Sequence, residues 1–269
     1  MKVAVIQLNV GENKSKNLSK AVHFIDEAAG KGADIILLPE CVNFFGDTAE
    51  IINQAETIPG PTSDVFSKKA KEHKIYINCG SIYEVADSKY AYNTSLLFDT
   101  NGEIIAKYRK IHLYDATFKD RFTSKESENI RPGNKLVTAD TEFGKFGLSI
   151  CYDVRFPELF RSLALEGCQM IFLPAAFPQY TGSMYWETLL RARAVENQCY
   201  IVAAGQYGKS YNGNVFFGNS LIIDPWGTVI AKAHEGEGIT MQDIDLSFVE
   251  QVRNNIPTFS HRKPEVYKL

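Results

Sequence analysis

The sequence predicts an α/β protein whose two similar halves form a four-layer α-β-β-α sandwich. Apolar runs of strand length alternate with segments of helical period, which is the pattern of a layered α/β fold. Residues 95–107 (SLLFDTNGEIIAK) match residues 220–232 (SLIIDPWGTVIAK) without gaps at an offset of 125 residues, and 32–40 (GADIILLPE) resembles 167–175 (GCQMIFLPA). These matches indicate an internal pseudo-duplication, although strand-turn-strand sequences also resemble one another by chance.

The apolar runs are predicted as strands because they have strand length and end at turn residues. In chain order they are 3–8, 35–38, 75–80, 94–98, 104–108, 146–151, 170–173, 200–204, 220–223, 229–232 and 239–244. Turns at Thr-Asn-Gly and Pro-Trp-Gly predict hairpins at 94–108 and 220–232. Apolar residues three or four positions apart predict helices around 18–28 and 186–197. Two more helices are expected at 62–72 and 157–166, the second beginning with a proline.

The composition is that of an ordinary globular protein. The chain has 269 residues, of which 45% are hydrophobic, 23% charged and 12% aromatic, so one domain is expected. A net charge of −3 gives no basic excess to attract nucleic acid or an anionic membrane surface. The start, MKVAVIQLNV, reads as a strand and not as a signal peptide. Because five scattered cysteines suit free thiols in a reducing compartment, we expect a cytoplasmic protein.

A carboxylate follows a strand that is apolar enough to be buried on both faces. Glu40 comes directly after Ile-Ile-Leu-Leu-Pro, and α/β sheets place their sites at the carboxyl ends of such strands. For a glutamate taken alone, a helix cap or a surface ion pair is the commoner role. Glu40 is therefore a candidate whose role depends on which other residues reach it.

A cysteine ends another apolar strand. Cys151 follows Gly-Leu-Ser-Ile and precedes Tyr-Asp-Val-Arg-Phe-Pro-Glu-Leu, in which the proline suits the start of a helix. This order resembles a nucleophile elbow, which exposes the sulfur and directs backbone N–H groups toward the reacting centre. An isolated cysteine is more often a small buried apolar residue. That is our expectation for Cys79, Cys168 and Cys199, whereas Cys41 is ambiguous.

Two charged residues near the middle of the chain are further candidates. Lys110 lies just past the strand 104–108. It is either solvated or turned inward as a cation that stabilises an oxyanion and an ionised thiol. Glu126, in the polar stretch 119–134, is either a second inward carboxylate or an ordinary loop residue.

No histidine is placed to act as the base for Cys151. His112 lies near Lys110, and the other histidines fall in expected helices or polar segments. This pattern argues against a papain-like protease and gives the base role to a carboxylate. The sequence shows no metal-ligand spacing, no Gly-x-Gly-x-x-Gly motif and no P-loop. We therefore expect chemistry that uses no metal and no cofactor.

Together these candidates resemble a known catalytic set. Glu40 in LLPE, Lys110 in YRKIHL and Cys151 in CYDVRFPEL resemble the Glu-Lys-Cys triad of the nitrilase superfamily, the carbon-nitrogen hydrolases. Further segments match in the same order, namely WETLLRARAVENQCYIVAAGQ (186–206), DPWG (224–227) and PEVY (264–267). The resemblance covers the whole chain and implies a single carbon-nitrogen hydrolase domain over residues 1–269. It also implies the α-β-β-α sandwich, commonly in a homodimer that extends it.

The resemblance implies a mechanism and a role for each candidate. Cys151 would attack the carbon of a primary amide and form a thioester, while Glu40 would move protons and then activate water. Lys110 and the backbone N–H of Tyr152 would hold the oxyanion. Glu126 falls where the family carries a second active-site glutamate, and it would orient Lys110 or the substrate amide.

Within the superfamily, KYRKIHLYD and ICYDVRFPEL are most similar to the Nit-type amidases, which include omega-amidase and deaminated glutathione amidase. The expected substrate is a small amide that carries a carboxylate, of the 2-oxoglutaramate or deaminated glutathione type. Arg155 is a candidate to bind that carboxylate, although pairing with a protein carboxylate is an equal alternative. Many such enzymes have Pro-Ala-His where this chain has Ser183-Met184-Tyr185.

Other functions stay open at this point. A general aliphatic amidase, a nitrilase and an N-carbamoyl amide hydrolase of the same superfamily would use the same triad on another substrate. A catalytically silent binding module would keep the fold alone.

Overall fold

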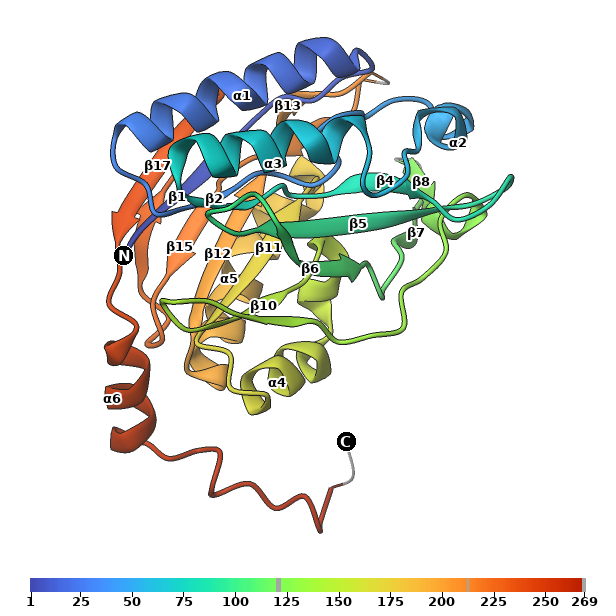
Figure 1. Ribbon diagram of the computed structural model, residues 1–269. Helices are drawn as coiled ribbons and strands as arrows, with labels where there is room; N and C mark the ends of the chain where they lie inside the picture. The colour runs from blue at the N-terminus through green and yellow to red at the C-terminus, as the bar shows by residue number, and fades with distance from the viewer. Residues whose placement is uncertain (120–121, 212, 268–269) are drawn as a thin grey trace.

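Two β-sheets lie face to face between two layers of helices, as the computed structural model of residues 1–119, 122–211 and 213–267 shows (Figure 1). The first half of the chain forms one sheet and its helices: β1 (Lys2–Gln7), α1 (Lys14–Gly30), β2 (Ile35–Leu37), α3 (Pro61–His73), β3 (Tyr76–Asn78), β5 (Ala91–Phe98) and β6 (Ile104–Arg109). The second half forms the other sheet: β10 (Lys145–Leu148), α4 (Pro157–Leu165), β11 (Met170–Ala175), α5 (Gln179–Asn197), β12 (Tyr200–Gly205), β15 (Leu221–Ile223) and β16 (Val229–Lys232). The predicted four-layer α-β-β-α sandwich is confirmed.

The two halves have the same topology. In each half, three parallel strands are connected through helices, and an antiparallel hairpin follows them at one edge of the sheet. At the opposite edges, β17 (Gly238–Asp243) pairs antiparallel with β1, and β9 (Thr138–Asp140) with β10. The register of both hairpins shifts at equivalent places, between Leu97 and Phe98 and between Ile222 and Ile223. These places are 125 residues apart, so the pseudo-duplication extends to a local irregularity.

The core follows from the alternation of side chains along each strand. Val3 and Val5 of β1 belong to the cluster that includes residues of both sheets, whereas Ala4 and Ile6 pack with α1 and α3. Successive side chains of a strand point to opposite faces, so a strand buried on both faces must be apolar throughout. This requirement explains why the central strands are continuous apolar runs in the sequence.

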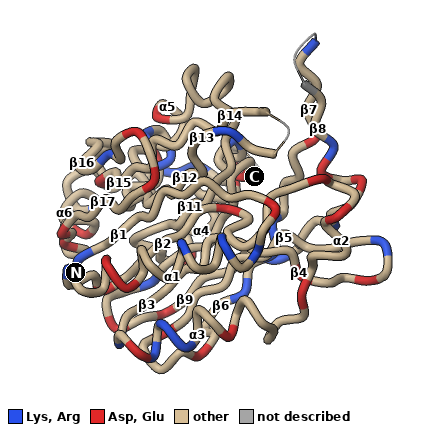
Figure 2. Tube along the Cα trace, turned by 90° about the horizontal axis from the view of Figure 1, so that it is seen from above, with Lys and Arg blue, Asp and Glu red and all other residues tan. Residues whose placement is uncertain are grey.

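The remaining elements are short or lie at the edges. They are the 3-10 helices η1 (Thr48–Glu50), η2 (Glu126–Glu128) and η3 (Cys151–Arg155), the helices α2 (Ile51–Gln54) and α6 (Ser247–Asn255), and the strands β4 (Ile82–Val85), β7 (Asp115–Phe118), β8 (Phe122–Lys125), β13 (Tyr207–Lys209) and β14 (Val215–Phe217). The hairpin β7–β8 projects from the body of the protein (Figure 2). Its described strands pair with each other and with no other strand.

Most predicted elements differ from the observed ones by a few residues at their ends, and two of these differences lie near Cys151 and the Ser183–Tyr185 segment. The strand predicted to run to Cys151 ends at Leu148, and Cys151 begins η3. The ladder ends because the Ile150 N–H donates to the Asp153 carboxylate and not to a neighbouring strand. The helix predicted from residue 186 begins at Gln179.

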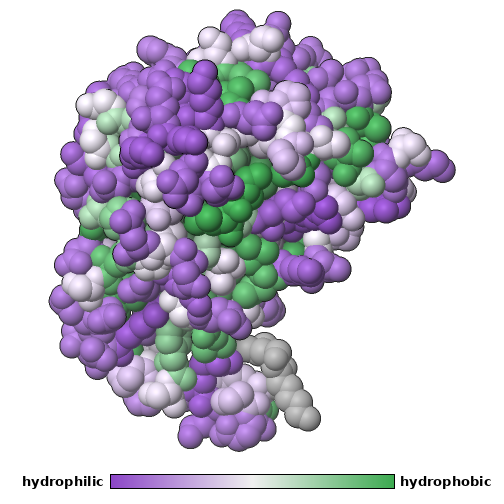
Figure 3. All heavy atoms as spheres, in the orientation of Figure 1, coloured by the Kyte–Doolittle hydropathy of each residue, from purple (hydrophilic) through white to green (hydrophobic). Residues whose placement is uncertain are grey.

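The surface is mixed in character. Charges of both signs are spread over it (Figure 2). Hydrophilic side chains cover most of the face shown in Figure 3, and apolar side chains gather toward its middle. None of the helices in the described part of the chain combines the length and the apolar character that crossing a membrane requires.

Candidate active site

Glu40 lies at the carboxyl end of β2 and is held at both of its carboxylate oxygens. Oε1 accepts hydrogen bonds from Lys110 Nζ and Asn93 Nδ2, both at 2.9 Å, and Oε2 accepts from the Ala176 N–H at 2.8 Å. Only 4% of the residue is exposed. Because Ala176 follows β11, this carboxylate joins the ends of strands from the two sheets.

The chain packs tightly behind Glu40, and one glycine permits this. Gly80 has a φ of +73°, and a Cβ at this position would lie 1.9 Å from the Pro39 carbonyl oxygen. Any side chain there would push the end of β3 away from the Pro39–Glu40 peptide. Glycine at this position is therefore required for the placement of Glu40.

Lys110 follows β6 and turns inward, as one of its two sequence interpretations expects. Its Nζ donates to Glu40 Oε1 at 2.9 Å and to Glu126 Oε2 and Oε1 at 2.8 and 3.1 Å. Burial alone would lower the pKa of this ammonium, but the charges of Glu126 and Glu40 outweigh burial and raise it well above its usual value. Lys110 is therefore a permanent buried cation.

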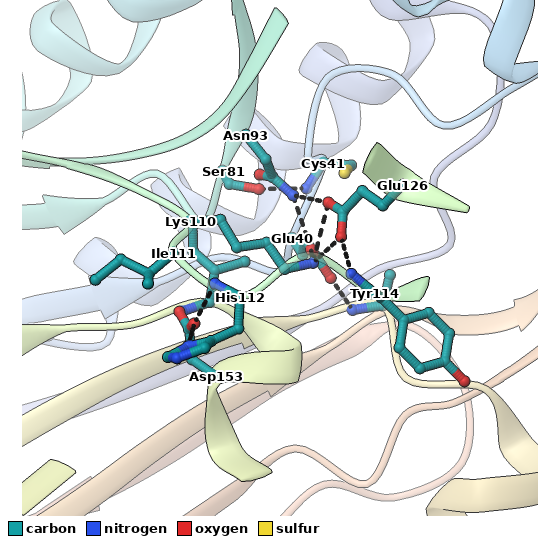
Figure 4. A network of polar contacts seen from close by, with 12 residues as sticks. Glu40, Cys41, Ser81, Asn93, Lys110, Ile111, His112, Tyr114, Glu126 and Asp153 are labelled. Atoms are coloured by element: carbon teal, nitrogen blue, oxygen red, sulfur yellow. Dashed lines mark hydrogen bonds and ion pairs between the residues drawn. The ribbon is translucent and has the colours of Figure 1, made fainter. Parts of the chain in front are cut away.

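Glu126 begins η2 and points into the same network (Figure 4). Besides Lys110, its carboxylate accepts from the Tyr114 N–H at 2.7 Å and from Asn93 Nδ2 at 3.3 Å. Tyr114 and Glu126 flank the two ends of the β7–β8 hairpin. The hairpin thus delivers a carboxylate to Lys110, which corresponds to the inward alternative of the two that the sequence left open for Glu126.

Cys151 lies at the turn between β10 and α4, with its backbone in the left-handed region at a φ of +46°. This conformation costs roughly 1–2 kcal/mol for a residue other than glycine. The thiol lies close enough to the Glu40 carboxylate and the Lys110 ammonium for the charges of both to act on it. Burial, followed by the charge of Glu40, raises the pKa of the thiol well above its usual value even though Lys110 lowers it. The resting thiol therefore keeps its proton and needs a base in order to react.

The other predicted site residues lie beside this group. Tyr152 is the second residue of η3, and N–H groups at the start of a helix have no acceptor within it. Arg155 Nη2 donates to the Tyr185 hydroxyl, and its guanidinium carbon lies 4.3 Å from the centre of the Tyr185 ring. Arg155 Nε is buried without a hydrogen-bond partner among the described residues. Arg155 therefore lies against aromatic rings, and it forms no ion pair with a carboxylate in the described part of the chain.

Several groups at the site were not predicted from the sequence. Asn93 lies within β5 and bridges the two carboxylates, and the Gln206 side chain donates to the Glu40 carbonyl at 2.7 Å. The N–H groups of Tyr114 and Ala176 belong to the backbone, which carries no sequence signal. Asn93 had one weak signal, a polar side chain in a run that otherwise reads as a buried strand.

Of the other four cysteines, Cys41 directly follows Glu40, and Cys79, Cys168 and Cys199 lie in the core. All five thiols are unpaired and buried. Burial raises the pKa of Cys79, Cys168 and Cys199 to about 12, as suits small core residues. The Cys41 thiol contacts the Tyr83 hydroxyl at 3.3 Å, and burial raises its pKa as well. Cys151 differs from the other four in that it begins a helical turn, η3.

One cluster of side chains has metal-ligand geometry, and it lies elsewhere. In the described residues Asp26, Glu72 and His73 come close enough together to share an ion. The Lys69 ammonium already lies 2.8 Å from Asp26 Oδ1 and 3.2 Å from Glu72 Oε2. The cluster sits on α1 and α3, away from Glu40.

The geometry provides the groups that acyl transfer needs. A thiol lies beside a carboxylate, and a buried cation donates a hydrogen bond to the same carboxylate. Such a set can activate a nucleophile and stabilise a developing oxyanion.

Comparisons with known proteins show the family of the chain. Residues 2–254 match the carbon-nitrogen hydrolase family. The chain is 41% identical to human omega-amidase NIT2 over 268 residues, which are 100% of this chain and 97% of that protein. It is 38% identical to mouse deaminated glutathione amidase over 271 residues, covering 98% of this chain and 84% of that protein.

Solved structures give the same result. The C. elegans NitFhit protein superimposes with a TM-score of 0.93 at 37% identity, covering 99% of this chain and 66% of the longer NitFhit chain. Saccharomyces cerevisiae Nit3, a member of branch 10 of the nitrilase superfamily, superimposes with a TM-score of 0.86 at 35% identity, covering 96% and 94% of the two chains. The resemblance to the nitrilase superfamily is confirmed, and the chain belongs to the carbon-nitrogen hydrolase family.

Proposed function

We propose that the enzyme hydrolyses the primary amide of a small carboxylate-bearing molecule to an acid and ammonia through a thioester at Cys151. The observation that carries this proposal is the proximity of the buried Cys151 thiol to Glu40, whose carboxylate accepts a hydrogen bond from the buried Lys110 ammonium. The substrate class follows from the similarity to omega-amidase NIT2 and deaminated glutathione amidase.

In the first half of the reaction the Cys151 sulfur attacks the amide carbon as Glu40 takes the thiol proton. A tetrahedral oxyanion forms, and Lys110 Nζ with the Tyr152 N–H stabilises it, each such contact being worth roughly 3–4 kcal/mol of barrier. The C–N bond then breaks, and Glu40 returns the proton to the departing nitrogen as ammonia. An acyl group remains on the sulfur.

In the second half Glu40 takes a proton from water, and the resulting hydroxide attacks the thioester carbon. The same donors hold the second oxyanion. The C–S bond breaks, the thiolate regains the proton from Glu40, and the carboxylic acid leaves. One carboxylate thus acts as base and acid in both halves.

Lys110 must release a contact in order to bind the oxyanion. Its ammonium has three N–H groups and three acceptors, of which Glu126 Oε1 is the most distant at 3.1 Å. Glu126 keeps its second oxygen on Lys110 at 2.8 Å when that contact opens. Glu126 Oε2 thus orients the lysine, while the contact of Glu126 Oε1 is replaced by one to the substrate oxyanion.

The substrate carboxylate would meet a group of donors next to Cys151. Arg155 Nε and the Tyr114 hydroxyl are both buried and make no hydrogen bond to a described residue. Burial first, and then the charges of Cys151 and Tyr185, raise the pKa of Tyr114 to about 12, so its hydroxyl stays a donor. Ser183-Met184-Tyr185 is the segment that departs from the family pattern. In it, Met184 is 58% exposed, whereas Tyr185 contacts Arg155.

Removal of the guanidinium tests this substrate assignment. We expect Arg155→Met to lower kcat/KM for 2-oxoglutaramate or deaminated glutathione by about tenfold to a hundredfold, because a charge-assisted hydrogen bond contributes roughly 1.5–3 kcal/mol. The rate with a neutral amide of matched length should change little. Ammonia release is the measurement, and Arg191→Met, which removes a guanidinium bonded to the Gly227 carbonyl, is the control.

A substrate panel separates the alternatives. Equal rates on neutral and carboxylate-bearing amides would indicate a general aliphatic amidase. Turnover of nitriles or ureides in place of amides would indicate a nitrilase or an N-carbamoyl amide hydrolase. Binding without release of ammonia from any of these compounds would indicate a silent binding module.

We also propose a homodimer, as the resemblance to the family implies. Val195 on α5 is 50% exposed and Trp226 in the β15–β16 turn is 44% exposed. The turn packs against α5, since a Cβ at Gly227 would lie 2.4 Å from Val195 Cγ2. Large exposed apolar side chains favour contact with a second copy of the chain. Light scattering of the wild type should give twice the chain mass of 30.2 kDa. The Val195→Glu variant should shift the protein toward the mass of one copy. A wild type with the mass of a single copy would contradict the proposal.

A further inference from the structure

Asp153 is fully buried, and its carboxylate makes four hydrogen bonds. Its exposed fraction is 0%. Oδ2 accepts from the Tyr108 hydroxyl at 2.7 Å and from the Ile150 N–H at 2.8 Å, and Oδ1 accepts from His112 Nδ1 at 2.7 Å and from the His112 N–H at 3.2 Å. Because a carboxylate only accepts, Nδ1 of His112 carries the proton. The catalytic scheme above leaves all of these groups unused.

The four donors come from two segments of the site. Tyr108 and His112 lie on either side of Lys110 in the chain, and Ile150 directly precedes Cys151. Asp153 therefore ties the segment that carries the cation to the turn that carries the thiol. Figure 4 shows Lys110, His112 and Asp153 in this arrangement.

The turn at Cys151 needs such support. Its left-handed φ of +46° is unfavourable for a cysteine, and strained residues persist only where their surroundings hold them. Asp153 closes the turn twice, since its carboxylate accepts from the Ile150 N–H and its own N–H donates to the Ile150 carbonyl at 3.0 Å. The His112 ring also stacks at 3.6 Å on Phe156, the residue that follows η3.

Tyr108 fixes the lysine segment from the other side. Burial, and then the charge of Asp153, raise the pKa of its hydroxyl well above the usual value, so it stays a donor. The same hydroxyl accepts from the Ile111 N–H at 3.3 Å. The backbone on both sides of Lys110 is thereby fixed relative to Asp153.

We propose that Asp153 and His112 are positioning residues that hold Lys110 and Cys151 at their working separation. They touch no substrate and act through the two groups that they connect. The alternative is that they only stabilise the core. The test by rates of ammonia release rests on the proposed function. The test by alkylation of Cys151 depends on the Cys151 thiol alone.

Two substitutions of His112 separate positioning from packing. The Asn side-chain nitrogen is as many bonds from Cα as Nδ1 of His, so His112→Asn keeps the donor and loses the ring. His112→Phe keeps a ring that stacks on Phe156 and loses the donor. Because misplacement by about 1 Å costs on the order of a hundredfold in rate, we expect His112→Phe to lower kcat about tenfold to a hundredfold with KM nearly unchanged. His112→Asn should stay within about threefold of the wild type.

The chemical test measures the rate at which iodoacetamide alkylates Cys151. The reaction is run below the melting temperature of each variant, and mass spectrometry of the Cys151 peptide measures its extent. We expect slow alkylation in His112→Phe and near-normal alkylation in His112→Asn. Alkylation of Cys151 should also be slow in Asp153→Asn, because the amide N–H₂ group of the new Asn side chain would face two hydrogen-bond donors. The matched control is Asp224→Asn, which changes a carboxylate that accepts from the Trp226 and Thr228 N–H groups at 2.9 Å each, in a distant turn. It should behave like the wild type.

The outcomes are distinct. The inference is overturned if His112→Phe is alkylated and turns over like the wild type, or if His112→Asn is impaired as strongly as His112→Phe. If the wild type releases no ammonia while alkylation follows the expected order, the proposed function fails and the positioning role stands. If ammonia is released and alkylation is insensitive to His112, the positioning role fails alone.

Discussion

Replacing Cys151 with Ala is expected to lower ammonia release by about 10⁴-fold or more, since loss of a covalent nucleophile removes the reaction path itself. The fold should survive because the change removes a single sulfur atom. Alanine is also no worse than cysteine in the left-handed backbone at this position, where φ is +46°. Initial rates of ammonia release, with melting curves for both proteins, measure the two effects.

The other cysteines provide controls for this result. Cys79→Ala, Cys168→Ala and Cys199→Ala remove thiols that are fully buried in the core. They should reduce stability and keep activity at temperatures where the variants are folded. Turnover at the wild-type rate in Cys151→Ala would rule out the thioester mechanism.

The layers of the fold were predictable because of how the strands are buried. Central parallel strands such as β2 and β11 are apolar on both faces, and this makes them visible as unbroken runs. The duplicated hairpins were predictable for a different reason, since both retain the same turn spacing. The shared register shift at Leu97 and Ile222 was not visible, because a bulge has no fixed sequence pattern.

The β7–β8 hairpin escaped prediction because its strands are only four residues long and largely polar. Asp115 and Thr117 are exposed, and the two strands pair with each other outside the main sheets. The alternation of β7 spans only four residues, which is too short to distinguish a strand from a polar loop. The consequence for the site is direct, since this hairpin places Glu126 on Lys110.

The candidate residues were easier to identify than their contacts. Glu40 and Cys151 each follow the carboxyl end of a parallel strand, β2 in one sheet and β10 in the other, so each was identifiable from its own strand. The contacts that fix them, from Asn93 and the Ala176 N–H, depend on how the two sheets stack. The sequence within one strand does not encode that stacking.

Removing the cation should have the second large effect, and it should affect stability as well as catalysis. We expect Lys110→Met to slow ammonia release by about 10²–10³-fold through loss of an oxyanion donor. The same change leaves Glu40 and Glu126 without their shared cation in a site where the Glu40 side chain is only 5% exposed. Breaking a buried ion pair in this way costs about 3–5 kcal/mol of folding free energy.

The double variant Lys110→Met/Glu126→Gln separates the two effects. Replacing Glu126 by the neutral Gln removes one of the two uncompensated carboxylates, so urea unfolding should show that part of the lost stability returns. Ammonia release should stay as slow as in Lys110→Met, because the oxyanion donor is still missing. If the double variant recovers activity together with stability, Lys110 serves only to neutralise the two glutamates, and the oxyanion then depends on backbone donors such as the Tyr152 N–H.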